Sequence, residues 1–263
     1  MRMKIDYVLM NPTGNMTILV ETPVPAASRP FCTAALMALE PTAEQLGYVS
    51  APAEDDPDCD IVLNMAGGEF CGNAAMSTAA LYALRGNPVT GAVRVRVSGA
   101  EEPVPVTLTV QPEGVYRCDA VMPRPCGIRE YCGMPLVELP GICHLIVTEP
   151  VSRQAAETAV RRWCAELGAD SLGMMVLDEA AGTLTPLVYV PGTEVMNWEN
   201  SCASGTAATG FWLAAREQTE VTRAFAEPAG TLSVTAAPNG RIVLHGSVFL
   251  THGACVELGF PQE

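Results

Sequence analysis

Two cysteines stand in closely similar surroundings in this chain. Cys71 lies in "EFCGNAAMSTAALYAL" and Cys202 lies in "NSCASGTAATGFWLAA". In both stretches small turn-forming residues follow the cysteine, and an alanine-rich run that favours a helix follows them. The pattern predicts that each thiol sits at or just before a helix N-terminus. Unpaired N–H groups and the positive end of the helix dipole lower a cysteine pKa there and also bind anions.

Such a pair suits the inversion of a stereocentre next to a carboxylate. Two helix ends facing each other would hold one carboxylate by backbone N–H groups and place a sulfur on each side of the carbon that bears it. One thiolate would remove the Cα proton, the opposite thiol would deliver a proton to the other face, and the N–H groups would stabilise the enolate charge. Three other interpretations are ordinary packing of small-residue helices, a thiol–disulfide protein and a non-catalytic amino-acid binder.

The elements that must position these cysteines occur twice. Each half of the chain reads as strand, helix, strand, cysteine-bearing helix and strands. The predicted helices span about Arg29–Glu40, Cys71–Leu84, Ser152–Leu167 and Cys202–Glu217, with Ser152 as an N-cap. Pro238-Asn239-Gly240 between alternating runs predicts a hairpin. The repeated order indicates an internal duplication, and hence two α/β lobes related by a pseudo-twofold axis with the active site in the cleft between them.

The joint between the halves is predicted in "VMPRPCGI", which contains two prolines. The predicted N-terminal lobe is residues 1–122, joined by the C-terminal tail from about 254 to 263. The predicted C-terminal lobe is residues 123–253.

Composition excludes several classes of partner. The formal net charge is −14, with 15 basic and 29 acidic residues, and this balance repels nucleic acid and anionic membranes. No apolar stretch approaches the roughly 20 residues that span a bilayer, and the N-terminus does not read as a secretory signal, so we expect a cytoplasmic protein. The ten cysteines lack zinc-ligand spacings, and we expect no metal site and no structural disulfides.

At these residues the chain resembles the diaminopimelate epimerase family, whose members racemise amino acids without pyridoxal phosphate. The matching motifs are "TGN" in the N-terminal loop, "N…E.CGNA" around Cys71 and "WE…C.SG" around Cys202. Within that family it is most similar to the histidine racemases of staphylopine-type opine metallophore pathways, through "NPTGNMTILV", "GGEFCGNAAMS" and "WENSCASGTA". The resemblance covers nearly the whole chain.

The resemblance implies an α/β (α+β) fold of two lobes, each a curved sheet around a central helix. It implies no cofactor, a small amino-acid substrate and a homodimer. It makes Cys71 and Cys202 the acid/base pair and His144 and Glu199 the groups that tune their pKa. The implied substrate-binding residues are Asn15, Glu44, Asn64, Gly72, Asn73, Glu199, Asn200, Ala203 and Ser204.

Two departures from the epimerases concern the substrate. Asn200 stands where they carry an arginine that pairs with the distal carboxylate of diaminopimelate, and Ile142 replaces an asparagine. Glu44 matches a glutamate that meets the imidazole in the histidine racemases, although from its position alone it reads equally well as a solvated residue at a helix end. The resemblance therefore implies interconversion of L- and D-histidine for metallophore biosynthesis. The alternatives are another polar or cationic amino acid and diaminopimelate itself.

Overall fold

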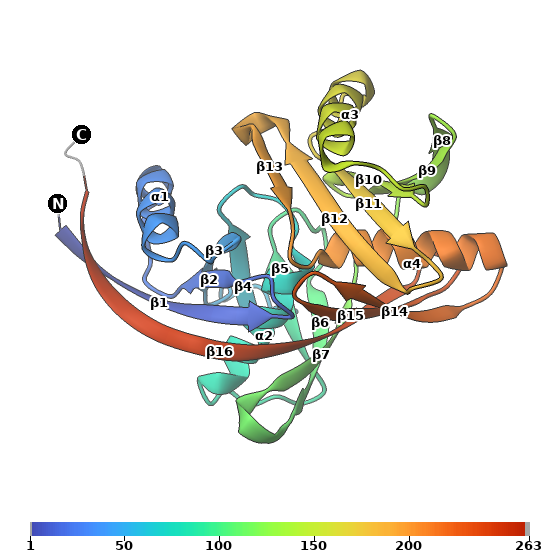
Figure 1. Cartoon of the computed structure of the whole chain (residues 1–263). Helices are drawn as coiled ribbons and strands as arrows, with labels where there is room; N and C mark the ends of the chain where they lie inside the picture. The colour runs from blue at the N-terminus through green and yellow to red at the C-terminus, as the bar shows by residue number, and fades with distance from the viewer. Residues whose placement is uncertain (1, 261–263) are drawn as a thin grey trace. The chain divides into compact units, whose positions relative to one another are not determined.

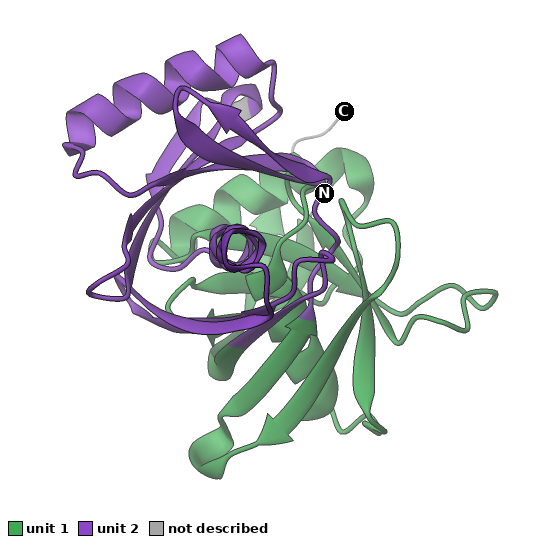
Figure 2. Ribbon diagram, turned by 90° about the vertical axis from the view of Figure 1, so that its right-hand side faces the viewer, with its two compact units in different colours: residues 1–120, 246–263 green, residues 121–245 purple. Residues whose placement is uncertain are grey.

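The computed structural model describes residues 2–260. The chain forms two compact units, Met1–Ala120 with Gly246–Glu263, and Val121–His245 (Figure 2). The boundary between Ala120 and Val121 falls at the start of the proline-containing stretch "VMPRPCGI". The C-terminal part of the chain joins the first unit from Gly246 onward, whereas the sequence predicted this from about residue 254. A single strand runs without a break from Ile242 to Gly259 and contains both positions.

The helices and strands are labelled in Figure 1. The first half of the chain contains the strands β1 (Arg2–Pro12), β2 (Thr17–Val20), β3 (Gln45–Ser50), β4 (Ile61–Met65), β5 (Ala92–Val97), β6 (Val104–Val110) and β7 (Tyr116–Val121), the helices α1 (Arg29–Leu39) and α2 (Gly72–Leu84), and the 3₁₀ turns η1 (Ala26–Ser28) and η2 (Pro112–Gly114).

The second half contains the strands β8 (Gly127–Tyr131), β9 (Met134–Leu139), β10 (Ile142–Val147), β11 (Leu172–Asp178), β12 (Thr183–Val190), β13 (Val195–Trp198), β14 (Val221–Glu227), β15 (Gly230–Ala236) and β16 (Ile242–Gly259), the helices α3 (Arg153–Leu167) and α4 (Ala203–Glu217), and the 3₁₀ turn η3 (Pro191–Thr193). No helix within residues 2–260 is both long and apolar enough to cross a membrane.

The strand order repeats between the units, as the duplicated sequence pattern predicts. In the first unit β1–β2 and β3–β4 pair antiparallel, whereas β2–β3 and β4–β5 pair parallel. The same alternation returns in β9–β10, β10–β11, β11–β12 and β12–β14. Each parallel pair needs a crossover connection, and each crossover contains one of the four helices.

The two cysteine-bearing helices are the centres of their units. α2 contacts every strand from β1 to β6, and α4 contacts β9, β10, β11, β14 and β15, so each sheet curves around one helix. Figure 2 shows α4 end-on inside the curved sheet of the second unit. Both helices are buried over most of their length, and their small residues allow strands to approach from all sides.

The other two helices are amphipathic and pack with one stripe. α1 buries Cys32 and Leu36, one helical turn apart, and α3 buries Ala156, Val160 and Cys164 at the same spacing. The hydroxyl of Ser152 accepts the N–H of Ala155, which confirms the predicted N-cap of α3.

The helix bounds agree with the sequence prediction to within about one residue at each end, and the hairpin is confirmed by the pairing of Ala236 with Ile242. The strands that the sequence did not predict are β3, β7, β8, β9, β13 and β14. In β3 the glycine Gly47 interrupts the alternation, because a Cβ there would lie 2.4 Å from Cδ1 of Leu63. In β14 the alternation ends on a buried carboxylate, Glu227, instead of an apolar side chain.

Candidate active site

Both cysteines are N-cap residues with nearly identical geometry. Cys71 has φ −133° and ψ 110°, and its sulfur accepts the N–H of Ala74 at 3.4 Å. Cys202 has φ −126° and ψ 103°, and its sulfur accepts the N–H of Gly205 at 3.3 Å. The predicted placement of each thiol at a helix start is therefore confirmed. A sulfur in this position takes one of the N–H groups that a helix N-terminus leaves without an intrahelical partner.

The first turn of α4 has little room around the sulfur. A Cβ on Gly205 would lie 2.1 Å from Sδ of Met175 and 3.1 Å from Sγ of Cys202. Ala74 holds the corresponding place in α2 and is fully buried. The glycine of "C.SG" thus meets a packing requirement of the second unit, since a side chain there would collide with Met175 and crowd the thiol.

The surroundings of Cys202 correct one expectation. Its side chain is buried, and burial raises its pKa well above the ordinary value, with the carboxylates of Glu199 and Glu227 raising it further. The hydrogen bonds from Ser204 and the Gly205 N–H act in the opposite direction and are smaller causes. The prediction that the helix end lowers the thiol pKa is wrong for Cys202, because desolvation and two like charges outweigh the helix N–H groups.

Glu227 is a residue that the sequence reasoning missed. It ends β14, is only 7% exposed, and accepts the backbone N–H of Cys202 at 2.6 Å and the hydroxyl of Thr206. Burial is the main cause that raises its pKa to about 8. A signal was present in the chain, because Val221, Phe225 and Glu227 share the inward phase of one strand. An acid on such a face requires a polar partner.

His144 is joined to Cys202 through one hydroxyl. Its ring Nε2 lies 3.0 Å from Oγ of Ser204, and that oxygen lies 3.6 Å from Sγ of Cys202. The imidazole is fully buried, and burial lowers its pKa to about 3, so the ring is neutral at ordinary pH. Gly173 on the neighbouring strand makes room for it, since a Cβ there would lie 2.1 Å from Nδ1 of His144.

Two of the predicted substrate-binding residues meet in the first unit. The side-chain amide of Asn15 donates to the Glu44 carboxylate at 2.8 Å. Asn15 is buried in the loop after β1, where Thr13 and Gly14 both have positive φ and the Gly14 N–H is held by Asn11. Glu44 directly precedes β3 and lies five residues beyond the end of α1. Glu44 is half-buried and does not lie at a helix end.

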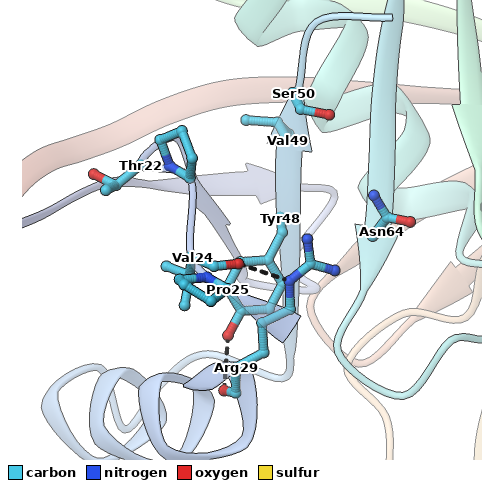
Figure 3. A pocket seen from close by; sticks show the side chains of 9 residues that line it. Thr22, Val24, Pro25, Arg29, Tyr48, Val49, Ser50 and Asn64 are labelled. Atoms are coloured by element: carbon cyan, nitrogen blue, oxygen red, sulfur yellow. Dashed lines mark hydrogen bonds between the residues drawn. The ribbon is translucent and has the colours of Figure 1, made fainter. Parts of the chain in front are cut away.

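Asn64 lines a pocket of about 310 Å³ in the first unit. Asn64 on β4 pairs with Tyr48 on β3, so their side chains share one face of the sheet. The guanidinium of Arg29 lies 4.8 Å from the centre of the Tyr48 ring and donates from Nε to the carbonyl of Val24 (Figure 3). The structure thus places Asn64 beside a cation and an aromatic ring.

The remaining predicted residues lie next to the two helix starts. Gly72 and Asn73 are buried in the first turn of α2. In the first turn of α4, Ala203 is buried and Ser204 is half-buried. Glu199 is half-buried and close enough to influence Cys202 and Glu227 electrostatically. Asn200 is exposed, and its carbonyl accepts the N–H of Ala229 in the turn after β14.

Comparison with known proteins shows the family of the chain. The family model described as the histidine racemase CntK N-terminal domain matches residues 4–250. A histidine racemase of Staphylococcus aureus is 31% identical over 225 residues, covering 80% of each chain. A histidine racemase of Fusobacterium nucleatum is 28% identical over 226 residues, covering 80% of this chain and 81% of that one.

A solved structure shares the fold at low sequence identity. A hydroxyproline epimerase from Agrobacterium vitis superposes with a TM-score of 0.69 at 12% identity, covering 97% of this chain and 91% of that one. The likeness supports a two-lobe epimerase-like fold, in which each lobe is a curved sheet around a helix. Because the family model matches nearly the whole chain, this protein belongs to the histidine racemase family.

Proposed function

We propose that this protein interconverts L- and D-histidine without a cofactor, using Cys71 and Cys202 as its two acid/base groups. The observation that carries the proposal is the matched N-cap geometry of the two cysteines, in a chain that belongs to the histidine racemase family. A single base returns a proton mainly to the face from which it came. Two thiols that act on opposite faces of one carbon have no such restriction.

The proton balance of the reaction is simple. One cysteine acts as thiolate and takes the Cα proton, so that the Cα–H electron pair moves into an enolate of the substrate carboxylate. The other cysteine gives its S–H proton to the opposite face of Cα. The product is the mirror-image amino acid, and the two sulfurs have exchanged protonation states. Backbone N–H groups at Gly72–Asn73 and Ala203–Ser204 stabilise the enolate charge, as helix N-termini stabilise anions generally.

Recognition of the imidazole is assigned to the first unit. Asn15 holds the Glu44 carboxylate through a hydrogen bond of 2.8 Å, which supports a role for Glu44 as a fixed acceptor for an imidazole N–H. Asn200, in place of an arginine, leaves no cation at that position for a distal carboxylate. Both features favour histidine over diaminopimelate.

Isotope exchange tests this function. The purified protein is incubated with L-histidine in D₂O, with no pyridoxal phosphate and with a chelator present. We expect the Cα hydrogen to be replaced by deuterium while D-histidine accumulates, as followed by proton NMR and chiral chromatography. An amino-acid binder or a thiol–disulfide protein would give no exchange, and that result would refute the proposal.

Oxidation tests whether the two thiols act at one site. We expect a mild oxidant to join Cys71 to Cys202 and to stop racemisation, and dithiothreitol to restore it. Peptide mapping identifies the linked pair. A racemase that loses no activity while both cysteines are oxidised would contradict the two-base mechanism.

Three wider features rest on the family resemblance and stay predictions. They are the supply of D-histidine to an opine-type metallophore pathway, a homodimeric assembly and a cytoplasmic location. Gel filtration with light scattering tests the assembly. Metabolite analysis of a strain that lacks the protein tests the pathway.

A further inference from the structure

The helix start at Cys202 has a buried acid behind it that no step of the proposed racemisation uses. Glu227 receives the Cys202 N–H at 2.6 Å and the Thr206 hydroxyl, and both donors are uncharged. Buried carboxylates are usually paired with a cation. In the part of the chain that the structure describes, Glu227 forms no ion pair.

The groups around Cys202 and Glu227 are acidic or neutral. Glu199, from the segment before α4, raises the pKa of both Cys202 and Glu227. His144, from β10, reaches the cluster through Ser204 and is neutral. The Glu227 carboxyl and the Cys202 thiol therefore share a desolvated region beside the half-buried Glu199, and a negative charge on one of these groups opposes ionisation of the others.

We propose that Glu227 is the positioning residue of Cys202: it holds the N-cap backbone in place and keeps the Cys202 thiol protonated in the resting protein. This inference rests on the proposed function, because it assigns different resting states to the two cysteines of that mechanism. Cys202 is then the proton donor of the resting protein, and Cys71 is the thiolate that begins the cycle.

The order of ionisation supports this assignment. The pKa of Glu227 is raised to about 8, so its carboxyl loses its proton before Cys202 does. At neutral pH the Glu227 carboxyl is mostly protonated, and its negative charge appears as the pH rises, before Cys202 ionises. Two thiols at identical helix ends would compete for one proton, whereas a carboxyl that ionises first beside one of them decides which sulfur keeps it.

The first unit has an uncharged group in the corresponding place. The residue after β5, Ser98, donates its hydroxyl to the carbonyl of Glu69 and accepts the N–H of Met65, so it ties down the segment before Cys71. Glu227 ties down the segment before α4 in the same way, through the N–H of Cys202. The anchoring function is common to both units; the anchor is a hydroxyl in the first and a carboxyl in the second.

Carbon NMR of the cysteines tests the proposal directly. The whole protein is labelled with ¹³Cβ-cysteine, Cys71 and Cys202 are assigned with the Cys71→Ser and Cys202→Ser variants, and the Cβ shifts are followed with pH in the absence of substrate. We expect Cys71 to ionise at lower pH than Cys202. Glu227→Gln preserves the shape and the acceptor oxygen but removes the charge. This variant should lower the titration midpoint of Cys202 by at least about one pH unit, which is a tenfold rise in its thiolate-to-thiol ratio at a given pH. The titration midpoint of Cys71 should not change.

A matched control separates local from global charge. Glu149→Gln removes the same charge from an exposed position of the same unit and should leave both midpoints unchanged. An unchanged Cys202 midpoint in Glu227→Gln, or equal shifts of Cys71 and Cys202, would overturn the proposal. If Glu227→Gln does not fold, the pH titration of the wild-type protein tests the proposal. The Cβ shift of Cys202 must then show a second inflection at the pH where the ¹³Cδ signal of Glu227 titrates. The absence of this inflection overturns the proposal.

The titration and the exchange experiment can refute the two proposals separately. Coupling between Glu227 and Cys202 without Cα exchange in D₂O would remove the racemase function and leave the charge effect standing. Exchange in D₂O without any coupling would remove only the assignment of Cys202 as the resting donor.

Discussion

The N-termini of α2 and α4 share one backbone geometry but lie in different electrostatic surroundings. In both, a cysteine sulfur accepts the N–H three residues later, at 3.4 Å for Cys71 and 3.3 Å for Cys202. Behind Cys202 lie the carboxyl of Glu227 and the link through Ser204 to His144, whereas the uncharged Ser98 anchors the segment before Cys71. A duplicated scaffold can thus retain the backbone position of a cysteine while the residues around it differ.

The largest expected effect comes from removing either sulfur. Cys71→Ser and Cys202→Ser should each lower the racemisation rate at least about 100-fold, because positioned acid/base groups contribute roughly 10²–10⁴-fold. Chiral chromatography measures the rate, and far-ultraviolet circular dichroism checks the fold. Cys132→Ser, which changes an exposed free cysteine, is the control and should keep full activity. If one of the two cap variants stayed fully active, the two-base mechanism would be wrong.

The charge difference between the helix ends should appear in the pH dependence of stability. The pKa of Glu227 is raised from 4.5 to about 8 in the folded protein, so above about pH 4.5 the folded state binds a proton that the unfolded state releases. Raising the pH through that window should therefore destabilise the wild type relative to Glu227→Gln, by on the order of a few kcal/mol at pH 8.

Urea unfolding at several pH values measures this difference. Because the pKa of His144 is lowered to about 3 in the folded protein, this residue contributes stability that increases as the pH rises toward about 6.5. The contribution is the same in the wild type and in the variant, so it cancels in the comparison. A difference between wild type and variant that stays constant from pH 5 to pH 8 would mean that Glu227 is not held in its neutral form by the fold.

Adding a methyl group in the first turn of α4 and removing one in the first turn of α2 should change the free energy of unfolding by different amounts. Gly205→Ala adds a Cβ that would lie 2.1 Å from Sδ of Met175, so it should lower the free energy of unfolding by about 1–3 kcal/mol despite the higher helix propensity of alanine. Thermal or urea unfolding measures the change. Ala74→Gly is the reciprocal control and should cost about 1 kcal/mol or less. A stabilised Gly205→Ala variant would show that the first turn of α4 can accommodate a Cβ at position 205, contrary to the close contacts in the structure.

The smallest expected effect concerns the first unit, where we place recognition of the substrate side chain. Glu44→Gln should raise the KM for histidine about fivefold, because a charge-assisted hydrogen bond becomes a neutral one and loses roughly 1 kcal/mol. Steady-state kinetics in both directions measures the change. The free energy of unfolding should stay within about 0.5 kcal/mol, since Glu44 is only half-buried. An effect on stability alone would remove Glu44 from the binding site.

Much of the fold followed from local patterns. The apolar stripes and the alanine-rich runs determined the four helices, and Ser152 marked the start of α3, because capping and helical periodicity depend on residues close together in the chain. The repeated order of elements predicted the duplicated sheet. β3 and β14 were missed because a close packing contact in one and a buried acid in the other disguise the alternation of a strand.

The sequence by itself determined that two cysteines begin two buried helices, since both the turn residues and the helix formers stand next to them. Only the tertiary structure decided how acidic Cys202 is. Its pKa depends on burial and on Glu227, which lies 25 residues further along the chain and reaches the Cys202 N–H because β14 ends beside the first turn of α4. Desolvation and Coulomb interactions act through space, and no local pattern encodes them.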